Sequence, residues 1–133
     1  MTKKEKELLL ADLCARLPYG IECTTKLTCY NDVYTVQGVY EDNVFIDCPV
    51  YEEGDDMWMV ESIIPYLRPM SSMTNQEIET YRALIGSLLE NSVTDNVATL
   101  YNFLNSKHLD YRGMIHMGLA LEAPEGMYDI KTE

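Results

Sequence analysis

The sequence predicts a single α+β domain: an N-terminal helix, a small antiparallel β-meander of three or four strands that can curl into a barrel, and two or three C-terminal helices. Three observations lead to this prediction. Apolar residues recur at helical spacing before residue 18, alternate with polar residues between residues 21 and 60, and return to helical spacing after residue 74. A length of 133 residues and a hydrophobic fraction of 47% are typical of one globular domain, residues 1–133.

The first helix is expected over residues 3–16. Its start carries a capping box, Thr2-Lys3-Lys4-Glu5, in which the Thr and Glu side chains bind each other's backbone N–H groups. Pro18 ends it, because proline cannot continue the helical hydrogen bonding. Apolar residues recur at helical spacing along this segment at Leu9, Leu10, Leu13, Cys14 and Leu17.

The β-meander is expected over residues 21–60. Its strands are predicted at residues 21–29, 33–40, 44–48 and 57–60, with turns at 31–32 and 41–43 and an acidic loop at 49–56. Connections this short require antiparallel neighbours, because a parallel crossover needs about a dozen residues. Gly38, in the middle of a strand, predicts a β-bulge that bends it.

Residues 63–74 form a joint between the strands and the helices. Pro65 and Pro69 each lack a ladder N–H and fix φ, so we expect neither a strand nor a helix here. The apolar residues of the joint still favour burial, which predicts an ordered connection packed on both halves. These residues are Ile63, Ile64, Tyr66, Leu67, Met70 and Met73.

The helical part is expected over residues 75–123, followed by a tail over 124–133. Thr74-Asn75-Gln76-Glu77 is a second capping box, and another helix is expected to begin at Ser92. Residues 119–121 should lie extended against the core. We expect all elements to share one core, in which four large side chains are buried: Phe45, Trp58, Tyr66 and Leu104.

The formal net charge of −12 is the strongest compositional feature. No basic residue occurs between Lys26 and Arg68, so direct nucleic-acid binding, which requires clusters of Lys and Arg, is disfavoured. If the strands align the acids of this stretch, they form an acidic rim made of Glu41, Asp42, Glu52, Glu53, Asp55 and Asp56. These acids do not follow the EF-hand pattern of alternating oxygen ligands with a central glycine, so we predict a solvated surface and no metal site.

The cysteines form no CxxC pair and have no histidine at zinc-finger spacing, so they are expected to be reduced and buried. They are Cys14, Cys23, Cys29 and Cys48. Asp12 and Arg16 interrupt the N-terminal apolar segment, which therefore does not match a signal peptide. No apolar run is long enough to cross a bilayer. We expect a cytoplasmic protein without membrane contact or cofactor.

Two places carry candidate binding chemistry. Arg68 lies in a segment that should be half buried, where it either pairs with a carboxylate or helix-end carbonyl or anchors a ligand's carboxylate or phosphate. The second place is the densest polar cluster in the chain: His108, Asp110, Tyr111 and Arg112. Asp110 either caps the following turn or orients His108 as a general base, with Arg112 stabilising an anion.

Three stretches together resemble a known family. They are residues 13–20 (LCARLPYG), residues 65–74 (PYLRPMSSMT), and residues 108–115 (HLDYRGMI) running into 118–123 (GLALEA). They are similar to small uncharacterised proteins of gut Bacteroidetes, often encoded in prophages and other mobile elements. The resemblance covers most of the chain and is weakest between Lys26 and Trp58. It implies an intracellular, mobile-element setting and brings no activity or cofactor.

The sequence contains no P-loop, no GxGxxG after a strand, no HExxH and no GxSxG. We therefore predict a non-enzymatic binding or accessory protein with an unidentified protein partner. Two alternatives stay open. One is an acidic inhibitor that mimics DNA toward a basic host protein, and the other is a small hydrolase that uses His108 and Asp110. The oligomeric state is left open.

Overall fold

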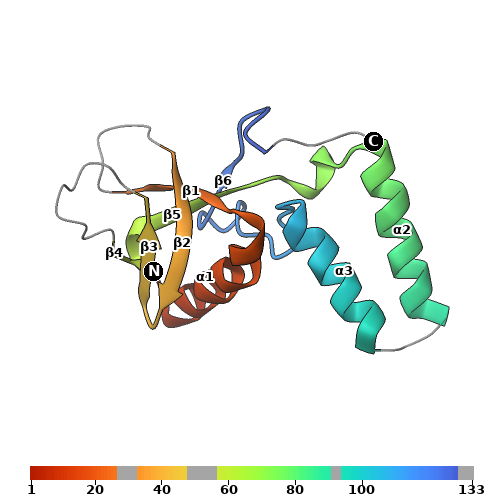
Figure 1. The fold of residues 1–133 in the computed structure, drawn as a ribbon, viewed down its shortest axis with the longest axis horizontal. Helices are drawn as coiled ribbons and strands as arrows, with labels where there is room; N and C mark the ends of the chain where they lie inside the picture. The colour runs from red at the N-terminus through yellow and green to blue at the C-terminus, as the bar shows by residue number, and fades with distance from the viewer. Residues whose placement is uncertain (27–32, 48–56, 91–93, 129–133) are drawn as a thin grey trace.

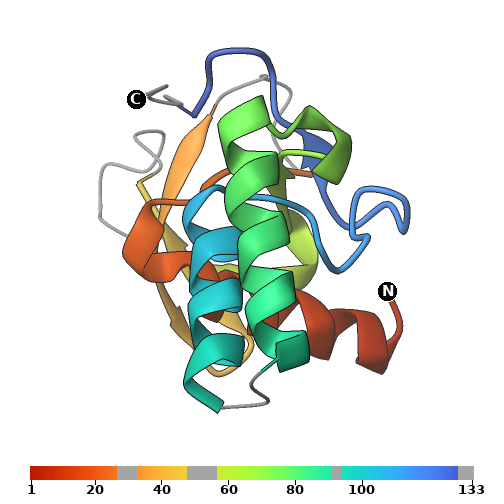
Figure 2. The same ribbon diagram turned by 90° about the vertical axis from the view of Figure 1, so that its right-hand side faces the viewer.

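The computed structural model describes residues 1–26, 33–47, 57–90 and 94–128. It confirms the α+β class: helix α1 (Lys3–Arg16) precedes an antiparallel-rich sheet and two C-terminal helices, α2 (Asn75–Glu90) and α3 (Thr94–Ser106). Figure 1 shows the sheet at one end, the α2–α3 pair at the other and α1 between them. Figure 2 shows α2 and α3 side by side. Single 3₁₀ turns connect these elements: η1 (Leu17–Tyr19), η2 (Val60–Ser62) and η3 (Met70–Ser72).

The sheet has six strands in the order β4-β3-β2-β1-β5-β6 and is open. They are β1 (Glu22–Thr25), β2 (Tyr34–Tyr40), β3 (Asn43–Ile46), β4 (Met57–Met59), β5 (Ile63–Leu67) and β6 (Leu121–Glu122). The predicted barrel and the predicted limit of four strands are therefore wrong. All neighbours pair antiparallel except β5 and β6, which pair parallel. The parallel pair forms because α2 and α3 lie between these strands in the chain and supply the long connection it needs.

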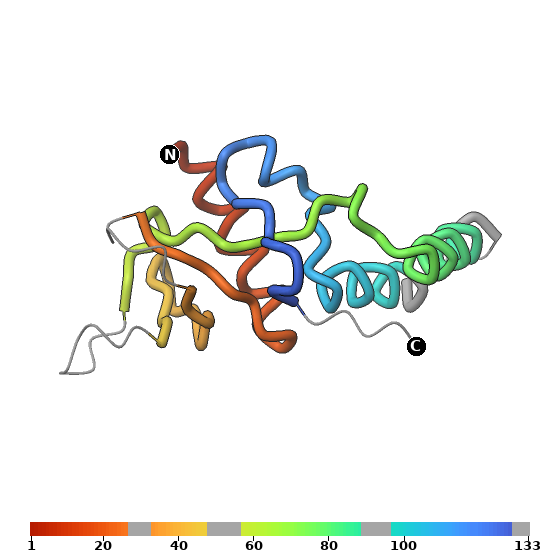
Figure 3. The backbone as a smooth tube through the Cα atoms, turned by 90° about the horizontal axis from the view of Figure 1, so that it is seen from above, coloured from red at the N-terminus to blue at the C-terminus, as the bar shows by residue number. Residues whose placement is uncertain are grey.

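Strand β5 contradicts the expectation that the first part of the joint is irregular. It lies inside the sheet, between β1 and β6, and contains Pro65. Lys26 donates its N–H to the Ser62 carbonyl opposite at 2.9 Å, which makes these two residues a hydrogen-bonded pair. Bonded and non-bonded pairs alternate along an antiparallel ladder, so Pro65 of β5, three positions after Ser62, falls in a non-bonded pair with Cys23 of β1. Pairing with β6 begins only at Tyr66, so the sheet loses no hydrogen bond at Pro65. Figure 3 shows β5 running from the sheet toward the helices.

The bulge predicted at Gly38 is confirmed. The register between β2 and β3 shifts so that Val36 lies opposite Ile46 and Gly38 lies opposite Phe45. Residues three apart in a regular strand face opposite sides of the sheet. The extra residue of the bulge reverses this alternation, so that residues on either side of it and three apart face the same side. Both Val36 and Val39 can therefore pack in the cluster beneath α1.

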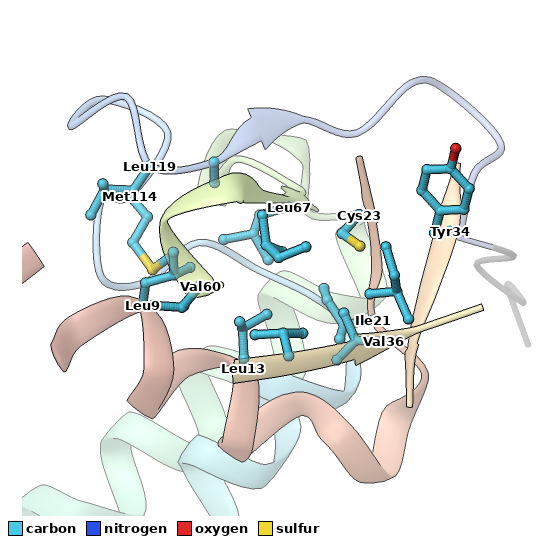
Figure 4. Packing of buried hydrophobic residues seen from close by; sticks show 14 residues of the cluster. Leu9, Leu13, Ile21, Cys23, Tyr34, Val36, Val60, Leu67, Met114 and Leu119 are labelled. Atoms are coloured by element: carbon cyan, nitrogen blue, oxygen red, sulfur yellow. The ribbon is translucent and has the colours of Figure 1, made fainter. Parts of the chain in front are cut away.

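Helix α1 begins at the predicted capping box and covers the inner face of the sheet. Thr2 Oγ1 accepts the Glu5 N–H at 3.1 Å, and the Glu5 carboxylate accepts the Thr2 N–H at 2.9 Å. Leu9 and Leu13 then point into a cluster that Met114, from the segment after α3, helps to close (Figure 4).

The buried apolar residues form two clusters, although one shared core was predicted. The first lies between α1 and the sheet, and the second lies around Leu104 and Leu109, between α2, α3 and the joint. Leu67 belongs to the first cluster and Met70 packs against the second. Residues 63–74 therefore pack on both halves, as predicted, although the first five of them are strand β5 of the sheet.

Of the four large side chains predicted to be buried, one is exposed. Leu104 is buried, and Trp58 and Tyr66 are partly buried, but Phe45 is 37% exposed. The prediction for Phe45 is wrong because Val44 and Ile46 face α1, so strand alternation turns Phe45 to the other side.

Several sequence predictions lie outside the described residues: the turn at 31–32, Cys29, Cys48 and the acidic loop at 49–56. Cys23 is buried, as predicted. Cys14 is exposed, contrary to expectation. The buried positions of α1 are Leu9, Asp12, Leu13 and Arg16, a stripe that does not include it.

Leu13→Ala should lower the free energy of unfolding by about 2–5 kcal/mol, because it leaves a cavity in a closely packed cluster. Leu121→Ala, at a position 43% exposed, is the matched control and should cost less than about 1 kcal/mol. Urea denaturation followed by Trp58 fluorescence measures both. Equal losses would contradict the packing of α1 on the sheet.

Candidate functional site

The Arg68 guanidinium is held inside the protein at the end of β5. Its Nη1 and Nη2 atoms donate to the two carboxylate oxygens of Glu77 at 2.9 and 2.8 Å. They also donate to the backbone carbonyls of Lys107 and Ser72 at 3.2 and 2.9 Å. Arg68 and Glu77 are each 5% exposed. The expectation that Arg68 pairs with a carboxylate or a helix-end carbonyl is confirmed, and it binds both kinds of group.

Glu77 serves the start of α2 at the same time. Its Oε1 accepts the Thr74 N–H at 2.8 Å, and its own N–H donates to Thr74 Oγ1 at 3.2 Å, which completes the predicted capping box. Burial alone would raise the pKa of Glu77, but the hydrogen bonds from Arg68 and from the Thr74 N–H outweigh it. The pKa of Glu77 therefore lies below its usual value, and the carboxylate stays charged.

The backbone of Arg68 binds the segment that follows α3. The Arg68 N–H donates to the His108 carbonyl and the Asp110 N–H donates to the Arg68 carbonyl, both at 2.8 Å. Arg68 and Leu109 form a parallel bridge. The two places that the sequence analysis treated separately are therefore in direct contact.

His108 ends α3 in a left-handed conformation with φ of 58°. Its N–H donates to the Asn105 carbonyl and the Leu109 N–H donates to the Leu104 carbonyl, both at 3.1 Å. This is a Schellman motif with His at the position that Gly usually takes. The His108 ring is stacked on Tyr128 with 3.8 Å between ring centroids, and the residue is 5% exposed.

Burial lowers the pKa of His108 to about 4. The positive charges of Arg16 and Arg68 act in the same direction, while a hydrogen bond to the Tyr19 carbonyl opposes them. The imidazole is therefore neutral at neutral pH and is a weak base there.

Asp110 caps the turn after α3, as the structural alternative predicted. Its Oδ1 accepts the Met114 N–H at 2.8 Å and its Oδ2 accepts the Ile115 N–H at 2.9 Å. Both oxygens of the carboxylate are thus committed to the backbone of the same turn.

Sequence reasoning missed a buried ion network on α1. Asp12 and Arg16, treated only as interruptions of an apolar segment, are both fully buried. Arg16 donates to Asp12 Oδ2 at 2.9 Å and to the Leu109 carbonyl at 2.7 Å, and Arg112 donates to Asp12 Oδ1 at 3.0 Å. The signal that could have revealed it is an Asp–Arg pair at i, i+4 spacing on the leucine face of the helix.

Tyr111 joins this network through its ring and its hydroxyl. The Arg16 and Arg112 guanidinium carbons lie 5.3 and 5.0 Å from the ring centroid. The hydroxyl donates to Asn105 Oδ1 at 2.8 Å and accepts from Arg112 Nη2 at 3.1 Å. Tyr111 and Arg112 therefore hold α1 against the end of α3.

Tyr128 is a second residue that sequence reasoning missed. Its hydroxyl accepts the Glu22 N–H at 2.9 Å and donates to the Tyr66 carbonyl at 2.7 Å, which fastens residues 124–128 across the sheet. Burial raises the pKa of Tyr128 well above its usual value, so the hydroxyl keeps its proton.

The candidate residues do not share one cleft. Arg68 and His108 line a cleft of about 290 Å³ together with Tyr128. Tyr111 and Arg112 line another, and Asp110 lines neither. The structure therefore divides the polar cluster that the sequence presents as one site.

The structure describes two residues of the predicted acidic rim. Glu41 and Asp42 are exposed at the turn between β2 and β3. Asp42 forms an ion pair with Lys6 at 3.1 Å, and Lys6 also binds Glu61 at 2.8 Å. The remaining rim residues lie outside the described residues: Glu52, Glu53, Asp55 and Asp56.

Comparisons of the chain with protein-family models, with curated proteins and with solved structures each gave no match. In the part of the chain that the structure describes, no helix is long and apolar enough to cross a membrane. Within the same residues, no group of three or more His, Cys, Asp and Glu side chains could hold a metal ion.

Arg68→Ala should lower the free energy of unfolding by about 3–5 kcal/mol, because it leaves the buried Glu77 carboxylate without its partner. Arg82→Ala, at an exposed position of α2, is the matched control and should change stability by less than about 0.5 kcal/mol. Urea denaturation at pH 7 measures both. Unchanged stability in Arg68→Ala, with loss of a binding activity, would instead indicate a ligand anchor.

Stability should fall between about pH 6.5 and pH 4 because of His108. In this range the unfolded chain protonates His108 while the folded protein keeps it neutral, so acid favours the unfolded state. The shift corresponds to about 3 kcal/mol at pH 4. Asn tolerates the left-handed backbone, so His108→Asn is a suitable variant. Between pH 7 and pH 4 its free energy of unfolding should fall by about 3 kcal/mol less than that of the wild type, measured by urea denaturation at the two pH values. His116→Asn, at an exposed position, is the control and should follow the wild type.

Proposed function

We propose that this chain is a non-enzymatic binding or accessory protein. The observation that supports the proposal is that Arg68 and the charged residues Asp110 and Arg112 of the polar cluster are bound by groups of the protein itself. The Arg68 guanidinium is neutralised by Glu77, Asp110 caps a turn, and Arg112 binds Asp12. A catalytic group must be free to exchange a proton or to stabilise developing charge, and groups held in this way are not.

The hydrolase alternative is weaker because it needs His108 as a general base. A pKa near 4 is far below the value that serves a general base at neutral pH. The ring is stacked on Tyr128, and the Asp110 carboxylate that would orient it binds backbone N–H groups instead. These contacts favour a structural role for both residues.

A second candidate function is inhibition of a basic host protein by an acidic, DNA-like surface. The observation that favours it is the charge distribution, since every charged residue between Lys26 and Arg68 is acidic. Glu41 and Asp42 lie at an exposed turn of this stretch, where a negative potential accelerates the approach of a basic partner. The resemblance to mobile-element proteins of gut Bacteroidetes is consistent with an intracellular host target.

Affinity capture from a host lysate tests both proposals. A basic partner should be retained at low salt and lost as salt rises, because the Debye length is about 8 Å at physiological ionic strength. A variant with Lys at Glu52, Glu53, Asp55 and Asp56 should lose this partner. The control carries Lys at four exposed acids outside the stretch and should retain it: Glu7, Glu79, Glu122 and Glu125.

If a partner is retained equally at low and high salt, and equally by the wild type and the charge-reversed variant, the acidic-inhibitor proposal is wrong and the broader binding role remains. Turnover in a screen of esterase, phosphatase and nuclease substrates, abolished by His108→Asn, would overturn the non-enzymatic proposal.

A further inference from the structure

The half of the sheet formed by β2, β3 and β4 carries large apolar side chains on the face away from α1. Phe45 lies opposite Met57, and Asn43 lies between Tyr40 and Met59. Residues two apart in a strand share a face, so these rows lie on one surface. We call its four large side chains the outer patch: Tyr40, Phe45, Met57 and Met59.

The outer patch is open to solvent. Tyr40 is 64% exposed, Met59 60%, Met57 46% and Phe45 37%. Figures 1 and 2 both show α1, α2 and α3 on the opposite side of these strands. Contiguous exposed apolar side chains of this size are typical of a surface that contacts another molecule.

Gly38 contributes to the shape of the outer patch. It lies opposite Phe45, and a Cβ placed on Gly38 would be 3.7 Å from Phe45 Cδ2. The missing side chain therefore leaves the Phe45 ring next to the bare backbone of β2. The bulge at this position turns Val36 and Val39 inward, and the exposed side chains of β2 are those of Gln37 and Tyr40.

The charges around the outer patch identify the kind of partner it fits. Glu41 and Asp42 follow Tyr40 directly, and Asp47 follows β3; all three are exposed. Lys6 is paired with Asp42 and Glu61, so Glu41 and Asp47 are the border carboxylates that set the negative charge beside the patch. A second copy of the chain would bring equal acidic borders together, and an anionic membrane surface would be repelled. A positively charged partner is attracted.

We propose that the outer patch is a docking surface for a basic protein segment, one that carries apolar side chains flanked by Lys or Arg. The apolar side chains cover the patch, and the cations face the surrounding carboxylates. This inference rests on the proposed binding function and names the surface that performs it.

The test uses the full-length chain and a ten-residue peptide with alternating Lys and Leu, with affinity measured by fluorescence anisotropy. Two further peptides separate the contributions: one replaces Leu by Ser, and one replaces Lys by Glu. The Lys–Leu peptide should bind at least tenfold more tightly than either. Met57→Ser with Met59→Ser should weaken its binding at least tenfold, whereas Met117→Ser, at an exposed methionine far along the chain, should not.

Equal binding of the Lys–Leu peptide to the wild type and the double variant, or no binding at all, would overturn the outer patch as the docking surface. Self-association in sedimentation that the double variant abolishes would overturn the basic partner in favour of a second copy. A partner captured from lysate that binds the double variant normally would leave the proposed binding function intact and refute only this inference.

Discussion

The pairing of Arg68 with Glu77 is the interaction that joins the two halves of this protein. Arg68 belongs to the end of the sheet, and Glu77 belongs to the first turn of α2, where it also caps the helix. The same guanidinium binds carbonyls of η3 and of the segment after α3, so one side chain contacts three elements of the helical half. A buried charge must be matched by partners, and these four hydrogen bonds supply them.

A second set of charges fixes α1 against the same region. The Asp12 carboxylate accepts hydrogen bonds from Arg16 of its own helix and from Arg112 of the segment after α3. Arg16 also donates to the Leu109 carbonyl. Leu109 in turn bridges to Arg68 in the sheet. The two apolar clusters are therefore connected through a polar layer. Directional hydrogen bonds in that layer specify one arrangement of helices and sheet, which apolar contacts alone would leave less defined.

These contacts bear on function because they engage the side chains whose types, in the sequence, suggest catalysis. A run of His, Asp, Tyr and Arg after a helix suggests an active site, yet here its members end α3, cap a turn and bind α1. The cost of desolvation has already lowered the pKa of His108 to about 4. The side of strands β2, β3 and β4 that no described helix covers exposes four large apolar side chains, and this is the surface that we propose binds another molecule.

Local features of the chain could be predicted from the sequence alone. Both capping boxes, at Thr2 and Thr74, form as expected, and so does the bulge at Gly38, because caps and bulges depend on residues a few positions apart. The alternation of the strands was also visible, although it did not say which face would be buried, and Phe45 was placed on the wrong one.

Tertiary structure decided what depends on contacts between distant residues. Pro65 is accepted inside the sheet because its missing N–H falls where no partner strand needs it, and that depends on register with β1 and β6. The parallel strand β6 and the Asp12–Arg112 pair join residues that α2 and α3 separate in the chain. Composition and periodicity describe short windows of sequence. They identified Arg68 as a charge that needs partners. That Glu77 is the partner depends on the folded chain, in which Thr74 caps α2 and the first turn of that helix brings Glu77 to the guanidinium.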